Sequence, residues 1–173
     1  EDLSRWDVSS VTTMEFMFCY CEIFNSDISN WDVSSVTDMR LMFFNCKVFN
    51  SDLSQWSVSS VTTMDHMFSI SEFNQDISSW DVSNVTNMRW MFRDSEFNQP
   101  IGNWDVSNVT NMYAMFWNTK FNQPIGNWDV SNVTDMSEMF SNSEFNQDIS
   151  SWDVSNVQDV EKMFYKSKFN QPI

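Results

Sequence analysis

The sequence predicts an α/β repeat fold: a single right-handed solenoid of about seven coils, each 24–25 residues long, with a short strand and a short helical turn. Two observations lead to this prediction. Tryptophan recurs every 24 or 25 residues, and Met and Phe keep fixed places between the tryptophans. Because one such unit cannot bury its apolar side alone, neighbouring units are expected to stack into one core. The repeating tryptophans are Trp6, Trp31, Trp56, Trp80, Trp104, Trp128 and Trp152.

Each element of the repeat is predicted from its apolar spacing. A strand is predicted over residues 101–106, where the last apolar residues alternate between inward and outward positions. A helical turn is predicted over residues 109–116, where apolar residues follow at spacings of 3, 3 and 1. Pro100 lacks an N–H group, so the strand is expected to begin after it. One extra residue in each of the first two repeats, beside Ile23 and Val48, predicts a bulge on the following loop.

Three sets of columns are expected to hold the coils together. All 13 Met residues fall in two columns of the repeat, and most of the 16 Phe residues fall in two others. These columns are interpreted as core packing rather than as a cofactor site. A column of Asn is expected to form a ladder whose amides satisfy backbone groups at a turn, at positions 25, 50, 74, 98, 122, 146 and 170.

The composition excludes several classes of function. Acidic residues outnumber basic residues 24 to 9, which gives a net charge of −15, so neither nucleic acid nor an anionic membrane is an expected partner. No stretch approaches the ~18 apolar residues of a membrane-spanning helix, so membrane insertion is not expected. The single histidine, His66, has no partner at catalytic spacing; we interpret it as a surface residue and expect no enzyme activity.

The segments WDVSNVTNMRWMF and FNQPIGNWDVSNVTNM resemble a known bacterial surface-protein repeat. That repeat is about 25 residues long, occurs in mycoplasma-type lipoproteins and is related to the BspA-like leucine-rich repeats. The resemblance covers the whole chain. It implies a leucine-rich-repeat-like solenoid displayed outside the cell, with adhesion or protein binding as the implied activity.

Columns that vary between repeats are the expected places for binding specificity. They flank the Met columns on the predicted helical turn, and polar residues in some repeats indicate contact with water. Apolar residues occupy them in other repeats, which favours a partner-binding edge, although scattered exposed apolar residues are normal on proteins. The candidate partner-binding residues are Phe16, Leu41, Phe44, Trp90, Tyr113 and Trp117.

An acidic column between inward Trp and Val residues is expected to form an outward strand face: Asp7, Asp32, Asp81, Asp105, Asp129 and Asp153. In one interpretation, each Asp accepts hydrogen bonds from its own turn, near the Ser and Asn that follow. In the alternative, the column binds calcium or a basic partner, because aligned carboxylates supply hard oxygen ligands. The dense acidic spacing of a dedicated calcium loop is absent, so we expect no metal site and no cofactor.

Three cysteines and three sequons leave further alternatives open. Cys21 and Cys46 share a column in neighbouring repeats, so either a disulfide or two small buried thiols would fit. The sequons begin at Asn84, Asn108 and Asn132. We interpret them as part of the repeat, because glycans about 5 Å apart would crowd one another.

We interpret residues 1–173 as one array, and expect a segment of a longer repeat protein because no signal peptide and no polar end caps are recognisable. The first functional hypothesis is an extracellular or cell-surface module for protein binding or adhesion, with a glycan as a further candidate partner. The alternative is a structural building block of a fibre, sheath or other assembly that self-associates through the solenoid ends or the helical edge.

Overall fold

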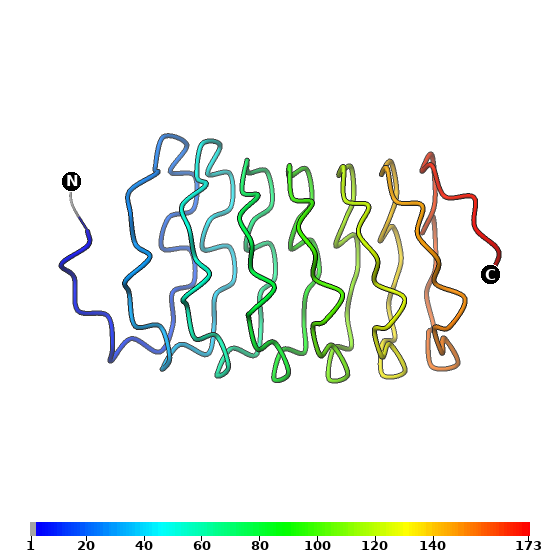
Figure 1. Cartoon of the computed structure of the whole chain (residues 1–173), viewed down its shortest axis with the longest axis horizontal. Coiled ribbons are helices and arrows are strands. Elements are labelled where there is room, and N and C mark those ends of the chain that lie inside the picture. The colour runs from blue at the N-terminus through cyan, green and yellow to red at the C-terminus, as the bar shows by residue number, and fades with distance from the viewer. Residues whose placement is uncertain (1–2) are drawn as a thin grey trace.

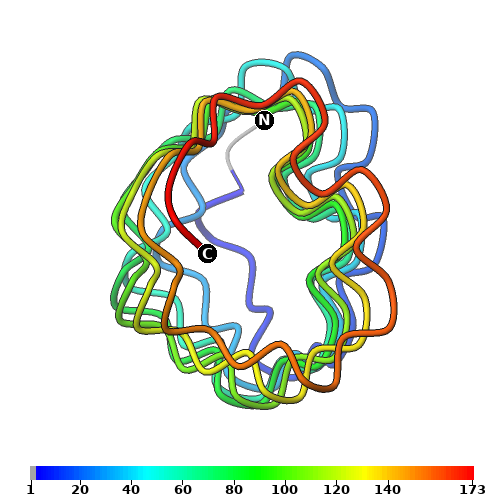
Figure 2. The ribbon, with the colours of Figure 1, turned by 90° about the vertical axis from the view of Figure 1, so that its right-hand side faces the viewer.

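The computed structural model describes residues 3–173. The chain winds in successive circuits, here called coils, that stack along one axis, with the first and the last described residues at opposite ends (Figure 1). Viewed along that axis, the coils superpose around a common centre (Figure 2). Isolated parallel bridges join each coil to the next, between residues 24 or 25 positions apart: Thr13–Asp38, Asp38–Thr63, Thr63–Asn87, Asn87–Asn111, Asn111–Asp135 and Asp135–Asp159.

The predicted α/β leucine-rich-repeat-like solenoid is wrong, because residues 3–173 contain neither an α-helix nor a β-strand beyond these isolated bridges. The predicted strand over residues 101–106 is replaced by turns. The N–H groups of Trp104 and Val109 donate to carbonyls three residues earlier, at 3.1 and 2.9 Å. Within the described chain, residues 97–109 make no backbone–backbone hydrogen bond to a neighbouring coil. This side of the coil therefore lacks the ladder that defines a sheet.

The predicted helical turn over residues 109–116 is also wrong, because two residues of each coil adopt the left-handed backbone conformation. In this repeat they are Ala114, with φ of 49°, and Asn118, with φ of 52°. An L-residue at such a φ cannot continue a right-handed helix. The hydrogen bonds alternate as a result: Met115 and Trp117 close turns within the coil, whereas Ala114, Phe116 and Asn118 donate to the next coil at 2.9–3.0 Å.

The Met and Phe columns fill the centre of the stack, as predicted. Met112, Met115, Phe116 and Phe121 have no exposed surface. Phe116 stacks on Phe121 of its own coil at 4.1 Å between ring centroids and on Phe140 of the next coil at 5.8 Å. Each ring therefore packs both within its coil and along the stack, which makes the core continuous.

Side chains join the coils where the backbone does not. The indole Nε1–H of Trp104 donates to the carbonyl of Ile77 in the preceding coil at 3.1 Å. The same bond recurs from Trp31, Trp56, Trp80, Trp128 and Trp152. The predicted Asn ladder is confirmed, since the N–H of Asn98 donates to Oδ1 of Asn74 at 2.9 Å and the pattern repeats along the column. Its side chains are half-buried or exposed rather than buried.

The extra residue of the first two repeats lies on the surface, where a bulge was predicted. Ile23 and Val48 are 92% and 41% exposed. The first two coils extend beyond the later ones at one edge (Figure 2, blue and cyan). The core columns are unaffected, because the added residue is accommodated on the outer loop.

Replacing Trp104 with Phe is expected to lower the free energy of unfolding by about 1–2 kcal/mol, because the indole hydrogen bond to Ile77 is lost while most of the ring burial is kept. Urea denaturation followed by circular dichroism measures this change. Trp6→Phe is the control: Trp6 is 55% exposed, and its replacement is expected to cost less than ~0.5 kcal/mol. Equal losses in both variants would contradict a structural role for the inter-coil indole bond.

Candidate interaction surface

The variable columns lie on the segment of each coil that carries the two left-handed residues. No helix exists there, so the predicted helical edge is instead an edge of alternating turn and inter-coil hydrogen bonds. Of the six predicted contact residues, Phe16 is 54% exposed. The other five are half-buried: Leu41, Phe44, Trp90, Tyr113 and Trp117.

Ring contacts connect this segment from coil to coil. Phe44 contacts Tyr20 at 5.2 Å and His66 at 5.8 Å between ring centroids. Trp90 contacts His66 at 4.2 Å and Tyr113 at 5.2 Å. We call these residues, together with Trp117, the aromatic row: Tyr20, Phe44, His66, Trp90, Tyr113 and Trp117.

The aromatic row differs from the predicted set in four members. No ring contact joins Phe16 to the row in the described part of the chain, and Leu41 has no ring to contribute. Tyr20 and His66 belong to the row but were not predicted. Both occupy the left-handed columns, with φ of 61° and 57°, so recognising the left-handed positions would have drawn attention to them.

Arginine side chains lie among the rings. The guanidinium carbon of Arg93 is 5.5 Å from the ring centroid of Trp90 and 4.9 Å from that of Trp117. Arg89 lies 5.7 Å from the Trp90 centroid. These distances are typical of cation–π contacts. Two of the few basic residues of the chain therefore lie at the aromatic row.

The interpretation of His66 as a surface residue is wrong. His66 is only 8% exposed, and its ring lies between those of Phe44 and Trp90. Its Nδ1 contacts the buried carboxylate of Asp65 at 2.5 Å, and the second oxygen of Asp65 accepts from Nε of Arg89 at 3.0 Å. The histidine is thus a packed and paired member of the row.

A small hollow of about 150 Å³ opens beside the end of the row, lined by Trp90, Arg93, Tyr113, Ala114, Trp117 and Glu138. Ala114 is 1% exposed and occupies the same column as Trp90 and Glu138 in the flanking coils. This coil therefore has a small side chain where the flanking coils have large ones, and those large side chains form walls of the hollow. Aromatic and arginine side chains around a recess are the usual makeup of a binding hot spot.

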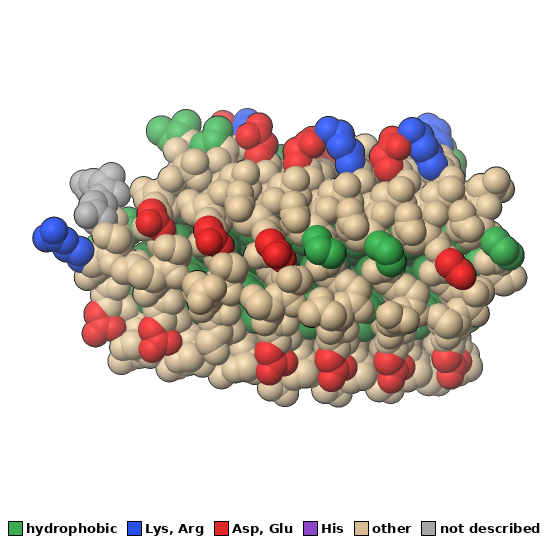
Figure 3. Space-filling view, in the orientation of Figure 1, with side chains coloured by type: hydrophobic (Ala, Val, Ile, Leu, Met, Phe, Trp, Pro, Cys, Tyr) green, Lys and Arg blue, Asp and Glu red, His purple; other side chains and the backbone are tan. Residues whose placement is uncertain are grey.

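The acidic column is exposed and lies just before turns rather than on a strand. Oδ1 of Asp81 accepts the N–H of Ser83 at 3.1 Å and its hydroxyl at 2.6 Å. The backbone bond recurs in the other members: Asp7, Asp32, Asp105, Asp129 and Asp153. The predicted hydrogen bonding within each turn is confirmed. Acidic side chains stand in rows along one face of the stack (Figure 3).

The Ser83 hydroxyl, and secondarily the Ser83 N–H, hold the pKa of Asp81 below its usual value. A lowered folded-state pKa means that this stabilisation is present above the unfolded pKa and is lost as the pH falls through the folded pKa. Replacing Ser83 with Ala is therefore expected to raise the pKa of Asp81 toward its usual value, as measured by carboxyl NMR titration. The pKa of Asp129 in the same variant serves as the internal control. The assignment fails if Asp81 does not move, or if both residues move equally.

The three cysteines, Cys19, Cys21 and Cys46, are free thiols in the structure. Cys46 is buried, its Sγ–H donates to the carbonyl of Phe18 at 3.0 Å, and burial raises its pKa to about 12. Cys21 is exposed. Residues 3–173 contain no group of three or more His, Cys, Asp or Glu side chains arranged to hold a metal ion.

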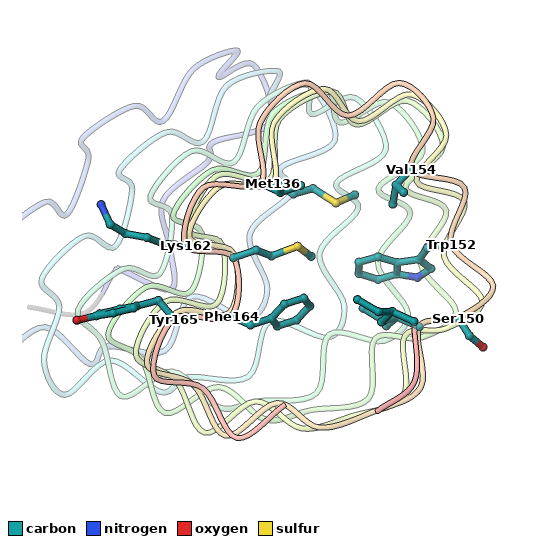
Figure 4. A pocket seen from close by; sticks show the side chains of 11 residues that line it. Met136, Ser150, Trp152, Val154, Lys162, Phe164 and Tyr165 are labelled. Atoms are coloured by element: carbon teal, nitrogen blue, oxygen red, sulfur yellow. The ribbon is translucent and has the colours of Figure 1, made fainter. Parts of the chain in front are cut away.

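The last coil presents an apolar face with a recess of about 610 Å³, whose lining includes Trp152, Val154, Met163 and Phe164 (Figure 4). The N–H groups at 160, 162, 164 and 166 are the counterparts of those that donate between coils elsewhere, and they have no acceptor in the described chain. In the first coil, the carbonyls at 13, 15, 17 and 19 likewise have no donor within residues 3–173. The two faces therefore match in the spacing of donors and acceptors.

Among the described residues there is no helix with the length and hydrophobicity needed to cross a membrane. Neither the curated proteins nor the solved structures include a match to this chain. One family matches in three overlapping segments, residues 1–96, 69–143 and 93–173, which together span the chain. The resemblance to a mycoplasma-type repeat is thereby supported, whereas the relation to BspA-like leucine-rich repeats is not confirmed. The chain belongs to the family described as Mycoplasma protein of unknown function, DUF285.

Proposed function

We propose that the chain is a non-catalytic protein-binding module, acting outside the cell or at its surface, that holds its partner through the aromatic row. One observation carries the proposal: half-exposed Trp and Tyr side chains gather with arginine on positions that vary between repeats. These residue types contribute most to protein–protein binding energy. The location is supported by the resemblance to surface-protein repeats; the relation to BspA-like repeats stays a prediction.

The scaffold suits this role because it fixes the row before a partner arrives. The backbone on both sides of Trp90 is bonded to the following coil, through the N–H groups of Trp90 and Phe92 at 2.8 and 3.1 Å. The rings of His66 and Tyr113 restrict the indole further. Side chains held in this way lose little conformational entropy on binding, which favours affinity.

Replacing both Trp90 and Trp117 with Ala is expected to lower attachment of chain-coated fluorescent beads to cultured animal cells by about tenfold or more, because two hot-spot side chains are lost. Tyr165→Ala is the control, since Tyr165 is 50% exposed and lies outside the row. Circular dichroism verifies that both variants fold. Pretreating the cells with protease or with glycosidase separates a protein partner from a glycan.

Attachment that survives the double replacement, or that Tyr165→Ala lowers equally, would overturn the proposal. If attachment is lost after glycosidase treatment of the cells but not after protease treatment, the aromatic row binds a glycan instead of a protein.

A second candidate function is a structural building block, which the inter-coil hydrogen bonds support, because the same bonds recur at every junction and can join coils of one chain or of two chains. Four N–H donors on the last coil and four carbonyl acceptors on the first repeat the spacing used between all internal coils. The surface that fits the apolar recess beside Trp152 and Phe164 is therefore another coil of the same repeat. A further coil, from this protein or from a second copy, would bury this face and satisfy the donors.

If copies stack in this way, the mass measured by light scattering is expected to rise with concentration, and more steeply at high salt, which screens the charge of −15. Val160→Asp, at a 57% exposed position in the recess lining, is expected to reduce the rise because it places a charge in the contact. Trp117→Ala is the control that tests the aromatic row instead. A constant mass near 20.5 kDa would contradict end-to-end assembly.

A further inference from the structure

The aromatic row ends in a step from large to small side chains. Trp90, Tyr113 and Trp117 each have a large residue at the equivalent place in the preceding coil, namely His66, Arg89 and Arg93. In the following coil the equivalent residues are small: Ala114, Ser137 and Ser141. All three small residues are buried. The hollow over Ala114 lies at this step.

The indole rings already bind cations within the chain. Arg93 lies 4.9 Å from the Trp117 centroid, and Arg89 and Arg93 lie 5.7 and 5.5 Å from the Trp90 centroid. The internal guanidinium groups are supplied by the coil that contains Trp90, whereas the coil after Ala114 supplies only small residues and Glu138 at the equivalent places. On this side of the hollow, Ser137 and Ser141 therefore occupy the places where Arg89 and Arg93 lie against the indole rings in the earlier coil.

Among the charged side chains around the hollow, one carboxylate forms no ion pair within the described residues. Arg93 pairs with Asp94 at 3.3 Å, and Lys162, whose pKa is raised by Glu161 and more weakly by Glu138, pairs with Glu161 at 2.7 Å. Glu138 is half-buried, lines the hollow and forms no ion pair within the described residues. Burial and then the negative charges of Glu138 and Asp135 raise the pKa of Tyr113, and the positive charges of Arg93 and Lys162 oppose this more weakly. An added cation would satisfy Glu138 while stacking on the rings.

We infer that the hollow receives an arginine or lysine side chain from a basic segment of a protein partner. The inference rests on the proposed function, because it names the partner chemistry of the same surface. The rings provide cation–π contacts, Glu138 provides the counter-charge, and the small side chain of Ala114 provides the space. The net charge of −15 attracts basic segments from a distance and raises the rate of encounter.

The test uses a dye-labelled peptide with one arginine between glycines and a matched peptide with neutral citrulline in its place. Fluorescence anisotropy measures the dissociation constant of each peptide. Ala114→Leu fills the hollow, and the column tolerates this residue because Leu41 occupies it at φ of 55°. Glu138→Gln removes the counter-charge. Glu72→Gln, at an exposed glutamate outside the hollow, is the control for a general loss of charge.

The arginine peptide is expected to bind about tenfold more tightly than the citrulline peptide, because one desolvated cation–π contact and one ion pair are gained. Ala114→Leu and Glu138→Gln are each expected to weaken arginine-peptide binding severalfold, whereas Glu72→Gln leaves it unchanged. Equal effects of Glu138→Gln and Glu72→Gln would mean only general attraction of a basic peptide to an acidic chain and would overturn the inference. Equal affinity of the two peptides would also overturn it.

Bead attachment measured with the same variants separates this inference from the proposed function. If Trp90→Ala with Trp117→Ala abolishes attachment while Ala114→Leu and Glu138→Gln change neither attachment nor peptide binding, the function stands and the inference falls. If the peptide data follow expectation while attachment survives every replacement, the hollow is a basic-side-chain site and the proposed function falls.

Discussion

The structure depends on one hydrogen-bonding pattern, in which alternate N–H groups of each coil donate to the next coil and the intervening ones close turns. Ala114, Phe116 and Asn118 show the first kind, and Met115 and Trp117 show the second. The pattern requires a left-handed residue at two positions per coil, none of them glycine. Such residues cost of order 1 kcal/mol each. Burial of the Met and Phe columns, which have almost no exposed surface between coils, offsets that cost.

The sequence pattern predicted correctly which residues are buried, but it predicted the wrong backbone conformation. The reason is physical. An apolar column is buried whether the backbone that carries it is helical, extended or turned, so the Trp, Met and Phe periodicity located the core correctly. The spacing of 3, 3 and 1 suits a helix, but it also arises when short turns bring Val109, Met112, Met115 and Phe116 to the same side. One signal against a helix was present: Asn45, Asn118 and Asn142 share a left-handed column, and Asn accepts that conformation more readily than most residues. The other left-handed column, with Phe, His and Trp, gives no such signal.

The candidate surface was predictable in part. Variation between repeats located Phe44, Trp90, Tyr113 and Trp117 correctly on one edge. The burial of His66 was not predicted because its neighbours, Phe44 and Trp90, lie more than twenty residues away in the chain and cover it only after the coils stack. The same holds for Arg93, whose contact with Trp117 comes from the preceding coil. Contacts of this kind depend on which residues of neighbouring coils lie side by side. The period of the repeat gives this register, whereas the order of residues within one repeat does not.

The left-handed column also explains how the surface can vary while the fold does not. Phe16, Leu41, His66, Trp90, Ala114 and Glu138 occupy it at φ between 49° and 60°. In each case the backbone N–H donates to the following coil, so the stabilising contact belongs to a group that every one of these residues carries. The side chain is left to the surface, or to the neighbours in its column. Substitution there changes the side chain that the edge presents without removing an inter-coil hydrogen bond, so the surface can vary while the contact that stabilises the stack is kept.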